Sequence, residues 1–165
     1  MKRVTGLGGV FFKAKNPNSM YEWYEKHLGI KREADGSGAM FHWRDFSDPD
    51  KTEMTVWSIF PENTKYFNPS TAPFMLNYRV DDLKGLLEAL KAEGVTVDPK
   101  VEEYDYGKFA WIMDPEGNRI ELWEPPAQKK RLNPSKRRPA AADRLSHQKH
   151  CRNSIPSTAE IQDTR

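Results

Sequence analysis

The most informative stretch of this 165-residue chain is Asp114-Pro115-Glu116-Gly117-Asn118-Arg119-Ile120-Glu121-Leu122-Trp123-Glu124-Pro125. Pro115 fixes φ at the second position of a turn, and Gly117 supplies the positive φ that a tight reversal needs. Residues 120–123 then alternate in the manner of a strand, which places Glu121 and Trp123 on one face. The stretch therefore predicts a hairpin whose second strand carries a carboxylate, Glu121, among apolar residues.

Two parts of the chain, residues 6–62 and 73–126, follow one plan: a strand, a helix and three more strands. The expected helix ends match, because Gly29 and Gly94 each follow an apolar helical stretch at a site where glycine commonly ends a helix. A single four-stranded module leaves a large apolar face exposed, so two modules are expected to pair. The sequence thus predicts an α+β fold of two paired βαβββ modules, with a curved, cup-shaped mixed sheet and helices outside.

The first module begins with a strand over residues 8–15, followed by a helix that Asn16 caps and Pro17 opens. Residues at helical spacing are expected to form the inward stripe of this helix: Met20, Trp23, Tyr24, His27 and Leu28. Three strands are expected after it, near residues 31–34, over 39–46 and over 52–60.

The second module begins with a strand over residues 74–80, and Asp81 is expected to cap its helix. The apolar face of this helix has spacing i, i+3, i+4 and i+7 and consists of Leu83, Leu86, Leu87 and Leu90. Its three later strands are expected near 96–97, over 108–113 and over 118–123.

Charge divides the chain at about residue 128. Residues 129–165 contain ten Lys and Arg against three Asp and Glu, a net charge of +7, whereas the preceding part has 16 basic and 21 acidic residues, a net charge of −5. The basic part has four Leu and Ile and no aromatic residue, so it buries too little apolar surface to offset its ordering entropy. We therefore expect a folded domain over 1–127 and a disordered basic tail over 128–165.

The cellular setting follows from what the sequence lacks. It has no run of about 18 apolar residues, so no membrane partner is expected. A single cysteine, Cys151, excludes an intramolecular disulfide. These features predict a cytoplasmic protein.

The hairpin and the duplicated plan together resemble the vicinal oxygen chelate (VOC) superfamily, which includes glyoxalase I, bleomycin-resistance proteins, fosfomycin-modifying enzymes and extradiol dioxygenases. In the metal-binding members of that family, four positions point into the cup. The resemblance places them at Gly9, Trp57, Met75 and Glu121. Glycine has no side chain, the thioether of methionine is a weak ligand for hard ions, and the indole of tryptophan only donates. Of the four residues, only Glu121 has a side chain that commonly binds metal ions, so no metal cofactor is expected.

Two histidines lie in the expected domain, and neither completes this set. His27 falls in the last turn of the first helix, where a cation suits the helix dipole. His42 falls on a strand and is a candidate for the wall of the pocket. A divalent ion held by an atypical set such as Glu121 with His42 stays as the alternative.

The candidate ligand-binding residues are mostly aromatic, and such residues in strands form core more often than ligand platforms. They are Phe11, His42, Trp57, Met75, Tyr78, Phe109, Trp111 and Trp123. Polar contacts near the mouth of the cup are expected from Asn77, Tyr78, Arg79, Tyr104 and Tyr106. Glu121 either pairs with a nearby donor or serves as a polar anchor, and it is the candidate catalytic residue if a proton is transferred.

The leading interpretation is a metal-free member of the glyoxalase/bleomycin-resistance group. It would bind a small, partly aromatic molecule in the cup, either to sequester it or to transfer a proton through Glu121. Whether the protein is an enzyme stays open. A metal-dependent lyase or dioxygenase is one alternative, and a nucleic-acid-associated protein working through its basic tail is a less favoured one. The oligomeric state is also open, with a homodimer among the possibilities.

Overall fold

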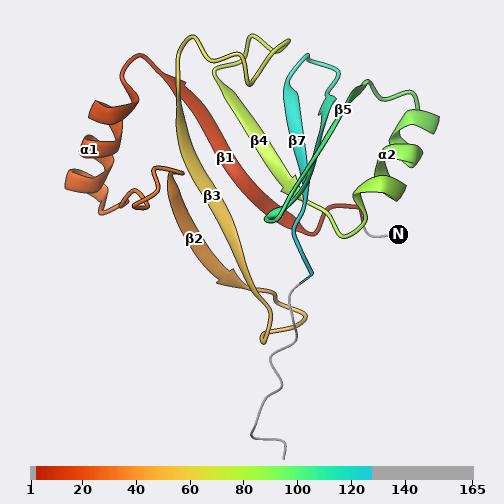
Figure 1. The fold of residues 1–165 in the computed structure, drawn as a ribbon, viewed down its shortest axis with the longest axis horizontal. Helices are drawn as coiled ribbons and strands as arrows, with labels where there is room; N and C mark the ends of the chain where they lie inside the picture. Colours follow the sequence, from red (N-terminus) through yellow and green to blue (C-terminus); the bar gives the residue numbers. More distant parts are fainter. Residues whose placement is uncertain (1–2, 128–165) are drawn as a thin grey trace, which may run out of the picture. The chain divides into compact units, whose positions relative to one another are not determined.

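The computed structural model describes residues 3–127. Two helices and seven strands follow one another in this part of the chain (Figure 1). They are β1 (Gly6–Ala14), α1 (Pro17–Leu28), β2 (Ala39–Arg44), β3 (Thr52–Pro61), β4 (Phe74–Arg79), α2 (Leu83–Ala92), β5 (Val97–Tyr104), β6 (Gly107–Met113) and β7 (Arg119–Glu124). The expected basic tail lies outside the described residues.

The strands form one mixed sheet in the order β2-β3-β1-β4-β7-β6-β5. Strand β1 runs parallel to β3, and β4 runs parallel to β7, so in each module the last strand pairs with the first. Antiparallel pairing of β1 with β4 joins the modules edge to edge, and the sheet remains open. The α+β class and the paired-module architecture are confirmed.

The two modules differ at their outer edges. Residues 31–34 form no strand, so the first module has only β2 and β3 after its helix. The expectation of a third strand there is wrong, because this short segment contains charged residues and passes into a Gly36–Gly38 turn whose two glycines have positive φ. The second module is complete, with β5 pairing to β6 along its outer edge.

Helix α1 begins as expected, with the Asn16 side chain accepting a hydrogen bond from the Ser19 backbone N–H at 3.2 Å. The expected inward stripe needs correction, because Tyr21 is the buried residue of this helix and Trp23 is 50% exposed. The β2–β3 pairing stops at Ala39 and Trp57, at the start of β2, so β2 does not cover the outer side of β3 beyond Trp57. There the Tyr21 hydroxyl accepts a hydrogen bond from the Ile59 backbone N–H at 2.8 Å.

Helix α2 begins one residue later than expected, with Asp82 rather than Asp81 as its N-cap. The Asp82 carboxylate accepts a hydrogen bond from the Gly85 N–H at 2.9 Å. The predicted leucine face is confirmed, since Leu83, Leu86 and Leu87 are buried against Val80, Ala110 and Leu122. No helix within residues 3–127 has the length and apolar character needed to cross a membrane.

Both helices cover the same face of the sheet. Phe12 on β1 contacts Tyr24 of α1, and Tyr78 on β4 packs against the core cluster beneath α2. The antiparallel register of β1 and β4 puts Phe12 and Tyr78 on one face. The opposite face carries a second cluster of buried residues, Phe11, Phe67, Met75 and Trp111. This second face is the interior of the cup.

Candidate functional site

The interior of the cup is organised around the carboxylate of Glu121 on β7, which is only 2% exposed. Asn77 on β4 donates to its Oε1 at 2.6 Å, and the Trp111 indole N–H on β6 donates to its Oε2 at 2.9 Å. The hydroxyl of Tyr66 also donates to Oε2. We call Glu121, Tyr66, Asn77 and Trp111 the Glu121 cluster.

The neighbouring strands position two of these donors by register. Asn77 pairs with Glu121 across the parallel β4–β7 ladder, and Trp111 pairs with it across the antiparallel β6–β7 ladder. Directly paired residues place their side chains on one face. Both donors therefore reach Glu121 without any distortion of the sheet.

Burial dominates the electrostatics of the cluster. Desolvation raises the pKa of Glu121, while hydrogen bonds from Tyr66, Asn77 and Trp111 and the charge of Arg119 oppose the rise. Burial and the negative charge of Glu121 raise the pKa of Tyr66 as well. Tyr66 therefore stays protonated and acts as a donor.

Tyr66 comes from the linker, residues 62–73, which connects β3 of the first module to β4 of the second. Its ring stacks on Phe60 with centroids 5.4 Å apart and planes inclined by 4°. The next residue, Phe67, is fully buried against Phe11 and Trp111. The linker thus places two aromatic side chains on the cup face: Phe67, which is fully buried, and Tyr66, which is 38% exposed.

Five of the expected ligand-binding residues lie on this face: Phe11, Met75, Phe109, Trp111 and Trp123. Trp123 stacks on Phe109 with centroids 6.1 Å apart and planes inclined by 5°. Phe11, Met75 and Trp111 are buried with Phe67 as core. The structure therefore brings these residues together, but as packed side chains around Glu121.

Two of the expected residues lie on the opposite face, and their assignment to the cup is wrong. Trp57 contacts Tyr24 of α1 at 4.7 Å between ring centroids and Phe12 at 5.4 Å. Its neighbour Val56 packs into the cup instead. Tyr78 likewise packs against the core beneath α2. A strand alternates its faces at every residue, so an alignment shifted by one position reverses the side.

His42 also lies away from the cluster. It is an exposed residue on β2, the edge strand, and three strands separate β2 from β7. A metal shared by His42 and Glu121 is therefore not supported by their placement.

The residues at the family's metal positions do not fit a metal ion. At Gly9, a Cβ atom would lie 2.7 Å from the Phe11 ring, so a larger ligating side chain has no room there. Met75 is fully buried in the apolar cluster, and Trp57 faces the helices. Within residues 3–127 no group of three His, Cys, Asp or Glu side chains is placed to hold a metal. Three donors engage the Glu121 oxygens, so only about one of the roughly four acceptor sites of the carboxylate remains for a metal ion.

The sequence did not indicate Tyr66 and Phe67 as site residues. The only available signal was an adjacent aromatic pair in the otherwise polar and proline-containing linker. Alternation and helical spacing do not apply to a linker, so nothing local predicted where these rings would pack.

Comparisons with known proteins agree with this architecture. Residues 7–122 match the model of the Glyoxalase/Bleomycin resistance protein/Dioxygenase superfamily. No curated protein sequence matches the chain.

Solved structures of methylmalonyl-CoA epimerases are similar in fold. A variant of the Streptomyces coelicolor enzyme in complex with 2-nitronate-propionyl-CoA is 15% identical with a TM-score of 0.54, over 75% of this chain and 99% of that chain. A methylmalonyl-CoA epimerase in complex with methylmalonyl-CoA and NH4+ gives the same identity and TM-score, over 75% of this chain and 96% of that chain. At this identity the likeness extends to the fold alone, and the family model decides the assignment: the chain belongs to the Glyoxalase/Bleomycin resistance protein/Dioxygenase superfamily.

Proposed function

We propose that this protein is a metal-independent member of its superfamily that binds a small, partly aromatic molecule in the cup, with Glu121 as the polar anchor. The observation that carries the proposal is the buried carboxylate of Glu121, surrounded by aromatic side chains and held partly by a residue of the linker. A mostly apolar concavity with one oriented polar group is the usual chemistry of a small-molecule site.

Binding is favoured over catalysis by the state of the Glu121 oxygens. Asn77 engages Oε1, and Tyr66 and Trp111 engage Oε2, so three of the roughly four acceptor sites of the carboxylate are already engaged in this arrangement. A methylmalonyl-CoA epimerase of similar fold is in complex with methylmalonyl-CoA, which is consistent with a fold suited to small ligands.

A ligand reaches Glu121 only if the linker withdraws Tyr66 and Phe67. Exposing Phe67 costs about 1.5–3 kcal/mol, and breaking the Tyr66 hydrogen bond to a buried carboxylate costs a similar amount. The population of the closed form therefore exceeds that of the open form by a factor of roughly 10² to 10⁴. The apparent affinity for the ligand is lowered by the same factor. A ligand offsets this free-energy cost if its own ring takes the place of the Phe67 ring and its own donor takes the place of the Tyr66 hydroxyl.

The test uses two matched probes, indole and 1-methylindole, whose binding is followed by ligand-observed NMR. Both offer an aromatic ring, but only indole has an N–H to donate to Glu121. The wild-type protein should prefer indole, and Glu121→Gln should reduce the ratio of the two affinities by about tenfold to a hundredfold. The ratio is the readout because the substitution also loosens Tyr66, which changes the opening of the linker equally for both probes.

Two further variants separate a binding site from a filled core. Tyr66→Phe should strengthen binding of both indoles by about tenfold or more, because it weakens the closed form without removing Glu121. Phe67→Ala creates space and should bind aromatic probes in any case. If Phe67→Ala binds the indoles but the wild-type protein and Tyr66→Phe do not, the cup is only core and the proposal is wrong.

A further inference from the structure

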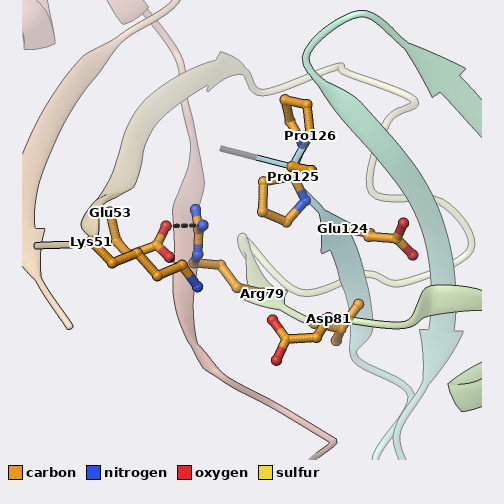
Figure 2. A pocket seen from close by; sticks show the side chains of 9 residues that line it. Lys51, Glu53, Arg79, Asp81, Glu124, Pro125 and Pro126 are labelled. Carbon is orange, nitrogen blue, oxygen red and sulfur yellow. Dashed lines mark hydrogen bonds and ion pairs between the residues drawn. The ribbon is translucent and has the colours of Figure 1, made fainter. Parts of the chain in front are cut away.

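A cavity lies where the start of β3, the end of β4 and the chain after β7 meet (Figure 2). Its volume is about 200 Å³. The residues that line it are Lys51, Glu53, Arg79, Val80, Asp81, Glu124, Pro125, Pro126 and Ala127. The proposed function of the cup uses none of these side chains.

Arg79 is the central cation of this cavity, although it is only 3% exposed. Its guanidinium lies over the Trp123 ring at 4.7 Å. It donates through Nη2 to the carboxylate of Glu53 (Figure 2). A guanidinium has five N–H donors in a planar fork that matches a carboxylate. Arg79 lines the cavity, and its hydrogen bond to Glu53 uses Nη2, one of the three guanidinium nitrogens.

The wall around Arg79 carries excess positive charge. Lys51 lies 2.7 Å from Glu53, so two cations share one buried carboxylate. The hydrogen bond to Glu53 raises the pKa of Lys51, with the charge of Asp81 also contributing, so Lys51 keeps its proton. This wall therefore suits an incoming carboxylate.

The remaining acidic residues of the cavity are not equivalent. Glu124 is engaged by Lys108 at 2.8 Å and by the Leu83 backbone N–H at 2.7 Å. Asp81 is exposed and has no such contact, and Figure 2 shows its carboxylate beside the cavity together with Arg79. Asp81 is therefore the acidic group available to an ammonium.

We propose that this cavity binds a small α-amino acid with an apolar side chain. The ligand carboxylate meets Arg79 and Lys51, its ammonium meets Asp81, and its side chain lies against Pro125 and Pro126. The volume is below the roughly 300–1,000 Å³ of sites for drug-sized ligands, which limits the occupant to a small molecule.

The test is isothermal titration of the full chain with L-valine, isovalerate and isobutylamine. L-Valine carries both charged groups, whereas the other two carry one each on a similar apolar body. L-Valine should bind at least about tenfold more tightly than either single-charge probe, because each satisfied charged contact is worth about a factor of ten.

Variants at Asp81 and Lys51 locate the site while keeping both Arg79 and Glu53. Asp81→Asn should weaken L-valine about tenfold and leave isovalerate unchanged, and Lys51→Met should weaken both carboxylates. Lys84→Met, an exposed position on α2 outside the cavity, is the matched control and should change neither.

Three results overturn the proposal: no binding of L-valine at millimolar concentration, equal binding of L-valine and isovalerate, or unchanged L-valine binding in Asp81→Asn. Glu121→Gln should leave L-valine binding intact. Failure of the cup proposal is therefore distinguishable from failure of this one.

Discussion

The hydrogen bond between Tyr66 and Glu121 gives the sharpest quantitative test of the structure. Tyr66→Phe removes one hydroxyl and keeps the ring, so stacking on Phe60 and the contact with Trp111 at 6.0 Å persist. What is lost is one of three donors to a carboxylate that is 2% exposed. A hydrogen bond to a poorly solvated charge contributes about 1.5–3 kcal/mol, so the free energy of unfolding should fall by that amount.

The chain supplies a matched control in Tyr104→Phe. The Tyr104 hydroxyl also donates to a glutamate, Glu102, at 2.9 Å, and its ring also stacks on a neighbour, Tyr106, at 5.0 Å. The side chain of Glu102 is 21% exposed, however, and also pairs with Lys100, so water replaces the lost hydrogen bond. Urea denaturation should therefore show a loss within about 0.5 kcal/mol for this variant.

Hydrogen exchange then shows which part of the structure loses stability. In Tyr66→Phe, amides of the linker, residues 62–73, should exchange faster, whereas amides of α2 should not. Equal losses of stability in Tyr66→Phe and Tyr104→Phe would refute the reasoning, because burial of Glu121 would then not strengthen the contact.

Three further predictions concern neighbouring features. Burial raises the pKa of Glu121 above its ordinary value of 4.5, so the folded chain holds this proton more tightly than the unfolded chain. The stability advantage of the wild type over Glu121→Gln should therefore be full below that value and shrink as the pH rises through the raised pKa, as measured by urea denaturation at a series of pH values. Arg79→Met should cost about 3–5 kcal/mol because it leaves Glu53 buried with a broken pair, and adding Glu53→Met should recover most of the loss in a double-mutant cycle. Gly8→Ala would place a Cβ atom 2.0 Å from the Asn77 amide oxygen, and thermal unfolding should show a loss of about 1–3 kcal/mol that Asn77→Ala partly relieves.

The architecture was predictable because its signals are local. Asn16 and Gly29 mark the ends of α1 by their capping chemistry, and the structure uses both. The turn before β7 follows from Pro115 and Gly117 in the same way, with Gly117 at φ 79°. These preferences depend only on a few adjacent residues, so they are readable from the sequence.

The identity of the side chains in the cup was only partly predictable. Alternation placed Glu121 and Trp123 together, but the absolute face of each strand depends on exact register, and one position separates Val56 in the cup from Trp57 beneath α1. A periodicity of two shows which residues share a face without showing which face that is.

The sequence by itself determined the two-module plan, the caps of α1 and the position of one carboxylate on β7. Tertiary structure decided what surrounds that carboxylate. Tyr66 reaches Glu121 from 55 positions away in the chain, and Arg79 meets Glu53 across 26 positions. Such contacts form because burying a charge is costly unless donors or opposite charges converge on it. That convergence depends on how the strands and the linker come together in space, and no local pattern of residues records it.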